Sequence, residues 1–201
     1  MINTRPQVNP GPVEDCLREP AVVDADGEII VAILAGQPSR FRLLYRRHQQ
    51  RVRSLLFQLC GPSALDDLVQ EVFLRVWKGL PRMERRAKFT TWLYRITCNV
   101  ASDFRRQAGK RRQQAETLQY EAHTLAPAPD LLELHYQDLV QRGLAVLKVD
   151  QRTVLVLHDL EGLAQKEVSE ILRIPVGTVK SRLFHARQNL RQFLYQEGIA
   201  L

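Results

Sequence analysis

Apolar residues recur at steps of three and four along almost the whole chain after residue 25, which is the period of an α-helix packed on one side. The clearest stripe lies in 63–80, where Ser63 is placed to cap the first turn. Its apolar members are Leu65, Leu68, Val69, Val72, Phe73, Val76 and Leu80. The same period predicts further helices over 26–35, 39–59, 90–106, 131–146 and 151–158. Strand patterns are nearly absent, so the fold class that we expect is all-α.

The helical pattern is interrupted once, between residues 107 and 130. This stretch contains Gly109 and the run Ala126-Pro127-Ala128-Pro129, which disfavour a helix and are typical of a tether. We therefore expect two small helical domains joined by a flexible linker. The boundaries that we expect are 1–23 for a disordered N-terminal tail without a secretory signal, 24–108 for the first domain, 109–130 for the linker and 131–197 for the second domain.

The pattern near the end of the chain predicts two short helices joined by a tight turn. The first follows Glu161-Gly162-Leu163 and ends near Leu172, and the second begins after Ile174-Pro175. The side of the second helix that faces the core is an apolar stripe made of Val179, Leu183, Ala186 and Leu190. This is the layout of a helix-turn-helix, which lays its second helix in the major groove of duplex DNA.

The opposite face of that second helix is polar and positively charged. It carries Thr178, Ser181, Phe184, His185 and Gln188, flanked by Lys180, Arg182 and Arg187. We expect Thr178 to cap the helix, the three basic side chains to bind phosphates, and Ser181 and His185 to contact base edges. Phe184 suits a thymine methyl group or a sugar. The alternative interpretation is an ordinary solvated basic helix face.

Composition favours a nucleic-acid partner and argues against several other classes. The formal net charge of +7 and the pI of about 9.7 suit nucleic acid or an anionic membrane surface. No apolar run approaches the roughly 20 residues that span a bilayer. Cys16, Cys60, Cys98 and the histidines are scattered, so we expect no disulfide framework, no metal and no cofactor, and a reducing cytoplasm fits. No nucleophile–base pair is recognisable, so we expect no enzymatic activity.

An acidic cluster in the expected helix 63–80 is unusual in so basic a chain. Because the apolar stripe of this helix faces inward, Asp67, Gln70 and Glu71 share one outer face at spacings i, i+3 and i+4. Carboxylates repel phosphate, so a basic protein surface is the fitting partner. The alternative is that Asp66 and Asp67 only interact with the helix dipole, and spacing alone does not separate the two interpretations.

Aromatic and basic side chains are interleaved between Lys88 and Asn99, a pattern that suits single-stranded DNA. Bases stack on rings while the strand follows the charge, and Trp92, Arg95 and Asn99 lie off the apolar stripe of this helix. Alternatively, Trp92 fills a gap between helices. The basic cluster that follows, over 105–112, is either a phosphate-binding strip or part of a solvated linker.

Three motifs together resemble the extracytoplasmic-function group of bacterial sigma factors in the sigma-70 family. They are Asp67-Leu68-Val69-Gln70-Glu71-Val72-Phe73, then Phe89-Thr90-Thr91-Trp92-Leu93-Tyr94-Arg95-Ile96 with Asn99, then Glu161-Gly162-Leu163 with Ile174-Pro175-Val176-Gly177-Thr178-Val179-Lys180-Ser181-Arg182. The resemblance spans about residues 26–195, in the family's order. It implies two helical domains, regions 2 and 4, in a factor that binds core RNA polymerase and directs it to a subset of promoters.

The resemblance also implies partners and residue roles. Docking on the clamp helices of the largest polymerase subunit is implied for Asp67, Gln70 and Glu71. Capture and opening of the minus-10 element are assigned to Lys88, Phe89, Trp92, Arg95 and Asn99. Contacts with the minus-35 element are assigned to Thr178, Lys180, Ser181, Arg182, Phe184, His185 and Arg187. Further expected partners are the flap of the second-largest subunit and an anti-sigma factor, which could hold this otherwise cytoplasmic chain at the membrane.

Three features depart from the family pattern. Lys148-Val149-Asp150 stands where Leu-Pro is usual, His185 stands where Arg is commoner, and the N-terminal tail of about 24 residues is longer than usual. The alternative function is a free-standing helix-turn-helix regulator, which would need a dimer interface and leaves the acidic cluster unexplained. An enzyme that modifies nucleic acid has no supporting cluster of residues.

Overall fold

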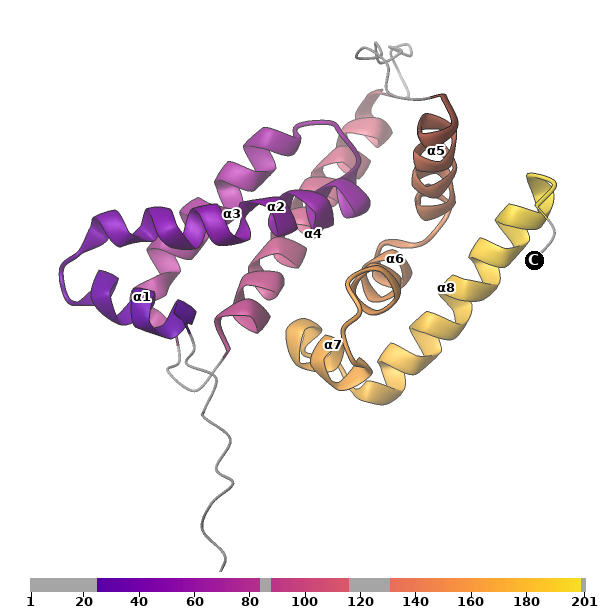
Figure 1. Cartoon of the computed structure of the whole chain (residues 1–201). Helices are drawn as coiled ribbons and strands as arrows, with labels where there is room; N and C mark the ends of the chain where they lie inside the picture. The colour runs from indigo at the N-terminus through magenta and orange to yellow at the C-terminus, as the bar shows by residue number, and fades with distance from the viewer. Residues whose placement is uncertain (1–24, 84–87, 116–130, 200–201) are drawn as a thin grey trace, which may run out of the picture.

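The computed structural model of the chain describes residues 25–83, 88–115 and 131–199, with side chains for all of these except 110–115 and 131–136. Within these ranges every regular element is a helix, so the expected all-α class is confirmed (Figure 1). The N-terminal tail and residues 116–130 of the linker lie outside the described residues. The α-helices are α1 (Ala25–Leu34), α2 (Phe41–Cys60), α3 (Leu65–Gly79), α4 (Phe89–Ala115), α5 (Leu131–Ala145), α6 (Val149–Leu155), α7 (Gln165–Leu172) and α8 (Val176–Gln196). Short 3₁₀ turns precede α2 (η1, Pro38–Arg40) and follow α3 (η2, Leu80–Arg82), and a π-helical turn follows α6 (η3, Val156–Leu160).

The first domain is formed by α1 to α4, with α2, α3 and α4 packed on one another. Their apolar stripes meet in a core whose most completely buried members include Leu44, Leu55, Leu56, Val72 and Val76. The stripe expected over 63–80 is buried as the periodicity indicates, apart from Leu65, which is half-buried. This core holds α3 and α4 in place, so their outer faces present the acidic cluster and the aromatic–basic run.

The second domain is formed by α5 to α8 and contains the expected helix-turn-helix as α7 and α8. The turn between them is fixed by Arg173, which adopts a left-handed conformation with φ 54°. The Ser169 hydroxyl donates to the Ile174 carbonyl at 2.6 Å across the same turn. Val179, Leu183 and Ala186 of α8 are buried against α6 and α7, as the apolar stripe predicts.

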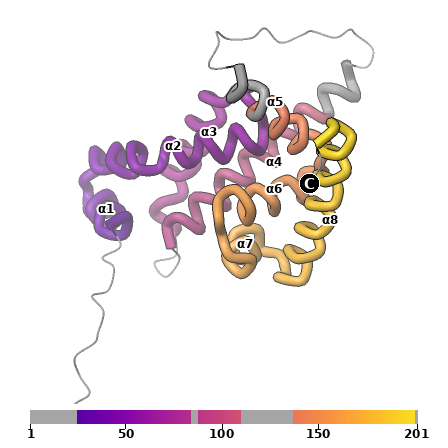
Figure 2. The backbone as a smooth tube through the Cα atoms, turned by 45° about the vertical axis from the view of Figure 1, so that its right-hand side comes forward, coloured from indigo at the N-terminus to yellow at the C-terminus, as the bar shows by residue number. Residues whose placement is uncertain are grey.

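The two domains lie against each other in this structure, with α7 beside α4 (Figures 1 and 2). α5 and η3 of the second domain contact α2 of the first. The buried apolar side chains of both domains form one continuous cluster. The sequence pattern did not indicate this closed arrangement.

Three local expectations were wrong. Ser63 does not cap α3, because the residue before the helix is Ala64 with φ 57° and no side-chain hydrogen bond. Thr178 does not cap α8, which begins two residues earlier after Pro175, and its N–H donates to the Pro175 carbonyl at 2.9 Å. α4 runs to Ala115, past the expected end at 106, because Gln, Ala, Lys and Arg propagate a helix well and one glycine costs only about 1 kcal/mol.

Candidate DNA and protein interfaces

The outward face of α8, called the reading face below, is accessible to a large partner. Lys180, Ser181 and His185 are exposed, and Phe184 has 65 % of its surface exposed. The Phe184 ring meets the His185 ring edge-on, with centroids 5.4 Å apart. The reading face therefore presents hydrogen-bond donors, positive charge and one aromatic ring to solvent on a single helix. This composition suits the major groove of DNA.

Two of the arginines expected to bind phosphate already have carboxylate partners within the second domain. Arg182 Nη2 lies 2.7 Å from Asp150 Oδ2. Arg187 forms a two-pronged pair with Asp159, with Nε and Nη2 at 3.0 and 2.6 Å from the two carboxylate oxygens. The hydrogen bonds to Asp159 raise the pKa of Arg187. A DNA phosphate would therefore compete with Asp150 and Asp159 for these guanidinium groups.

Thr178, the remaining minus-35 candidate at the start of α8, is half-buried.

Phe89 lies in the core, although the sequence places it among the minus-10 residues. It is 2 % exposed, and its ring packs on His48 at 5.2 Å and on Trp92 at 6.0 Å. In this conformation Phe89 cannot stack on a base, and it instead anchors the start of α4. Trp92 is half-buried, and a Cβ added at Gly79 would lie 2.9 Å from its Cζ2 atom. Trp92 therefore packs against α3 at Gly79, as the gap-filling interpretation expects.

The anchor of Phe89 depends on a buried polar pair. His48 Nε2 lies 2.8 Å from Asp26 Oδ2, and both side chains are about nine-tenths buried. Arg47 Nη1 lies 2.5 Å from the other oxygen of the same carboxylate. The helical period places His48 on the inner side of α2, but only the tertiary structure shows that Asp26 of α1 meets it.

The remaining minus-10 candidates are separated by the closed arrangement. Lys88 and Asn99 are exposed. Arg95 instead reaches α7, where its Nη2 and Nε donate to the carbonyls of Glu170 and Ile171 at 2.7 and 3.1 Å. The structure therefore does not gather the five predicted minus-10 residues into one open surface.

The acidic cluster of α3 is on the surface, as expected, and Asp67 and Gln70 are exposed. Glu71 is less available because its Oε1 accepts from Arg75 Nε at 2.7 Å. The same guanidinium group bonds Asp103 of α4 at 3.0 Å, and these hydrogen bonds raise the pKa of Arg75 and lower that of Asp103. Asp67, Gln70 and Glu71 are called the docking face below.

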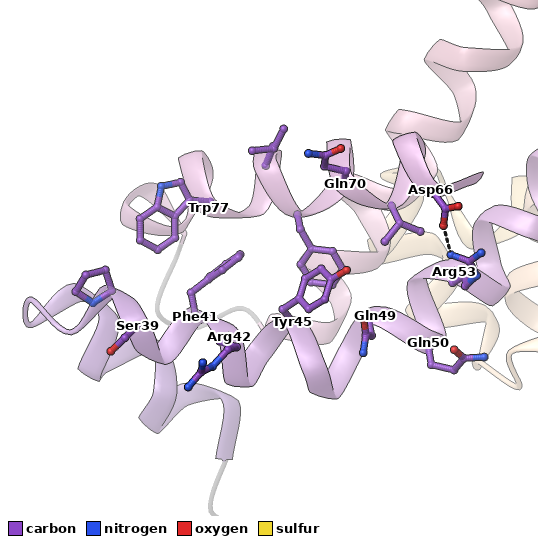
Figure 3. A pocket seen from close by; sticks show the side chains of 14 residues that line it. Ser39, Phe41, Arg42, Tyr45, Gln49, Gln50, Arg53, Asp66, Gln70 and Trp77 are labelled. Atoms are coloured by element: carbon purple, nitrogen blue, oxygen red, sulfur yellow. Dashed lines mark hydrogen bonds and ion pairs between the residues drawn. The ribbon is translucent and has the colours of Figure 1, made fainter. Parts of the chain in front are cut away.

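An aromatic groove between α2 and α3 borders the docking face and was missed by the sequence analysis (Figure 3). Its volume is about 880 Å³. The apolar part of its lining is Phe41, Tyr45, Val69, Phe73, Leu74 and Trp77. Leu74 and Trp77 are 45 % and 42 % exposed and line the same groove, and an exposed apolar patch of this kind is typical of an interaction site. A signal was available, because Gln70, Leu74 and Trp77 recur at steps of four and three outside the buried stripe.

The described residues offer no centre for metal chemistry and no membrane span. Among them, no group of three or more His, Cys, Asp or Glu side chains could hold a metal ion. None of the helices in those ranges combines the length and hydropathy needed to cross a bilayer. Cys60 and Cys98 are free thiols, and burial raises their pKa to about 11 and about 12.

Comparison with known families matches both domains. Residues 44–111 match Sigma-70 region 2, and residues 137–190 match Sigma-70, region 4. The ECF RNA polymerase sigma-E factor of Haemophilus influenzae is 30 % identical over 173 residues, which cover 81 % of this chain and 92 % of the relative. The protein of the same name from Escherichia coli K12 is also 30 % identical over 173 residues, covering 81 % and 91 %.

Two solved structures are similar to the closed chain. The structure of CnrH in complex with the cytosolic domain of CnrY superposes with a TM-score of 0.66 at 24 % identity, covering 86 % of this chain and 98 % of that one. The sigma factor RpoE in complex with the anti-sigma factor NepR from Bartonella quintana gives a TM-score of 0.63 at 25 % identity, covering 77 % and 96 %. The shared fold thus extends over nearly the full length of both solved chains.

Proposed function

This chain belongs to the sigma-70 family as an extracytoplasmic-function sigma factor, and from that premise we propose how its surfaces divide the work of transcription initiation. The first domain binds core RNA polymerase and opens the minus-10 element. The second domain reads the minus-35 element through the reading face of α8. The observation that carries the proposal is that face, because Lys180, Ser181 and His185 are exposed on a helix whose opposite stripe is buried except for the half-buried Leu190.

Core polymerase docks on the first domain at the docking face and the aromatic groove. The clamp helices of the largest subunit lie across Asp67 and Gln70, whose polar groups suit basic side chains. Leu74 and Trp77 at the groove accept an apolar side chain of the same partner. An apolar contact beside a charged one is the usual composition of a strong protein interface.

The second domain meets the flap of the second-largest subunit at a separate apolar surface. Val140 and Val146, on α5 and just after it, are 48 % and 53 % exposed, and Val149 at the start of α6 is 36 % exposed. These valines lie at the α5–α6 junction, whereas the reading face lies on α8. The domain can therefore hold polymerase and DNA together.

The minus-10 element is captured by the exposed side chains of the α4 region. Lys88 and Asn99 contact the strand, Trp92 stacks on a base, and Arg95 binds the backbone once it leaves α7. A base stacked on an aromatic ring is worth about 1–3 kcal/mol, which helps to offset the cost of unpairing. Phe89 contributes by anchoring the helix.

An anti-sigma factor is a further partner, because one of the similar solved structures is a sigma factor, RpoE of Bartonella quintana, in complex with the anti-sigma factor NepR. The chain works in the bacterial cytoplasm and catalyses no reaction itself, since the polymerase performs the chemistry. An anti-sigma factor could hold it at the membrane.

The test is transcription in vitro with core polymerase and a promoter library. Wild-type chain is expected to co-elute with core polymerase and to select promoters that carry two elements. Asp67→Lys with Glu71→Lys is expected to abolish co-elution, while the matched pair Glu28→Lys with Asp138→Lys, on exposed sites elsewhere, leaves it intact. Wild-type affinity in the docking-face variant would contradict the docking assignment. Duplex binding without any polymerase contact would favour a free-standing regulator.

A further inference from the structure

The ring of Trp92 stands at the end of a chain of side-chain contacts that begins on α1. Asp26 Oδ2 of α1 lies 2.8 Å from His48 Nε2 of α2. The His48 ring meets the Phe89 ring with centroids 5.2 Å apart, and the Phe89 ring meets that of Trp92 at 6.0 Å. Four side chains are thus in unbroken contact, and the last is the ring proposed to stack on a minus-10 base.

The carboxylate at the start of this chain is held at both of its oxygens. Arg47 Nη1 lies 2.5 Å from Asp26 Oδ1, while His48 bonds Oδ2. The side chains of Asp26 and His48 are only 10 % and 8 % exposed. Hydrogen bonds to a carboxylate are directional, and they are strong where water is excluded. They therefore restrict rotation of the His48 ring, which meets Phe89 edge-on.

The first turn of α4 is tied to the same rings. Phe89 is the first residue of α4 and is 2 % exposed. The Trp92 N–H donates to the Lys88 carbonyl at 3.2 Å, so the backbone at Lys88 belongs to this turn. Because a close-packed interior transmits displacements, a shift of the His48 ring moves Phe89. Lys88 and Trp92 then move with it.

Stability alone is a weak reason for the polar pair of Asp26 and His48. Exchange of a buried charged pair for apolar side chains of similar volume is often neutral or stabilising. An apolar pair does not supply direction, however, because only a hydrogen bond fixes the angle at which the two groups meet. The pair therefore contributes orientation, and it does so directly behind the turn that carries Lys88 and Trp92.

We propose that Asp26 and His48 are positioning residues for promoter opening, which hold Phe89 so that the Trp92 ring keeps the orientation that accepts an unpaired minus-10 base. This inference rests on the proposed function for the role of Trp92. Both positioning residues are buried and contact no DNA, so their effect is exerted through the ring. Loss of the pair weakens the open complex and leaves polymerase docking and minus-35 reading unchanged.

The experiment is a double-mutant cycle in the holoenzyme, with Asp26→Ala, Trp92→Ala and the variant that carries both. Initial promoter binding and the lifetime of the open complex are measured separately, at a temperature where every chain is folded. Asp26→Ala is expected to leave initial binding unchanged and to shorten the lifetime by about fivefold, the low end of what one stacked base contributes. In the Trp92→Ala background it is expected to have no further effect, because residues in one contact chain are not additive.

Two further variants separate positioning from loss of stability. Leu59→Val removes one methylene from the core of the same domain, near the far end of α2. It is expected to lower the melting temperature and to leave the lifetime unchanged. His48→Gln keeps a nitrogen that can bond Asp26 but removes the ring that meets Phe89. It is expected to shorten the lifetime as well, and it keeps the test valid if Asp26→Ala fails to fold.

An additive cycle, in which Asp26→Ala shortens the lifetime equally with and without the Trp92 ring, would overturn the positioning role. Unchanged lifetimes in Asp26→Ala and His48→Gln would do the same, as would an equal effect of Leu59→Val. In these cases a shortened lifetime in Trp92→Ala still supports the proposed function. A wild-type lifetime in Trp92→Ala would contradict the proposed role of Trp92, and the positioning role with it.

Discussion

α4 and α8 are the two helices that the sequence assigns to DNA, and they differ in how much of the assigned surface is available. On α8 the reading face is bare, with Phe184 65 % exposed. On α4, Phe89 is 2 % exposed and Arg95 is bound to α7. α8 buries only its apolar stripe, and its Arg182 and Arg187 pairs stay within the second domain, whereas α4 also buries an aromatic ring and binds the other domain through a basic side chain. The same residue types therefore stabilise the fold on α4 and remain available to DNA on α8. Matching substitutions in the two helices should differ in their effects on stability and on DNA binding.

The largest expected difference comes from removing one phenylalanine ring from each helix. Phe89→Ala empties a site enclosed by His48 and Trp92, so we expect a loss of about 3–5 kcal/mol in the free energy of unfolding. Phe184→Ala removes an exposed ring and should change that free energy by less than about 0.5 kcal/mol. Urea denaturation of both variants measures the contrast. Similar losses would show that the two rings do not differ in this way.

Trp92 is expected to act in both folding and promoter opening. Trp92→Ala should lower the stability of the open complex by about 1–3 kcal/mol, because a stacked base is lost. Gly79→Ala is the companion variant, since its Cβ would crowd the ring at 2.9 Å without removing it. Open-complex lifetimes, set beside thermal unfolding, measure the two effects. If Trp92→Ala abolishes cooperative unfolding, the ring is purely a core residue.

His185 sharpens the comparison on the α8 side, where changes should alter sequence preference and leave folding intact. A single imidazole contact lies at the lower end of base discrimination, so His185→Ala should change preference by about 1 kcal/mol at one or two minus-35 positions. Binding to a panel of minus-35 variants measures this. Gln196→Ala, at an exposed site at the far end of α8, serves as the control. An unaltered preference would remove His185 from the set of base-reading residues.

The smallest expected effect concerns the pair between Arg187 and Asp159. Asp159→Asn frees the guanidinium group for phosphate, and affinity for all DNA sequences should rise by less than about 1 kcal/mol, because exposed pairs are weak. Arg187→Ala should lower affinity on all sequences and reduce the salt dependence by about one phosphate contact. Titrations at several salt concentrations measure both. A sequence-dependent effect of Arg187→Ala would instead indicate contact with a base.

Much of the fold could be predicted from local pattern, because burial of one face imposes a period that is visible in the chain. The stripe of α8 and the helix-turn-helix were predicted in this way. The cap at Ser63 was wrong because α3 starts from a left-handed Ala64, a choice that no side-chain type signals. α4 continues past its expected end because the helix-forming residues around Gly109 outweigh the cost of this single glycine.

The candidate site was less predictable than the fold, because periodicity says which side of a helix is buried but not which helix buries it. Arg95 and Phe89 carry suitable chemistry for DNA, yet their partners, Ile171 and His48, come from distant parts of the chain. The aromatic groove likewise requires α2 and α3 to be placed side by side. Such contacts depend on tertiary packing, and the local spacing of Gln70, Leu74 and Trp77 marks only the α3 side of the groove.

Arg95 of α4 and Arg152 of α6 both donate across the domain interface to main-chain carbonyls, Arg95 to those of Glu170 and Ile171 and Arg152 to that of Leu59, and this has a consequence for how the interface can evolve. Glu170 is exposed, and its replacement by most other residues leaves its carbonyl where Arg95 finds it. Arg95 and Arg152, by contrast, have no equivalent substitute, since lysine lacks the planar fork. Neutral drift is therefore tolerated on the acceptor side and restricted on the donor side. Among descendants of this chain, the two arginines should persist while position 170 varies.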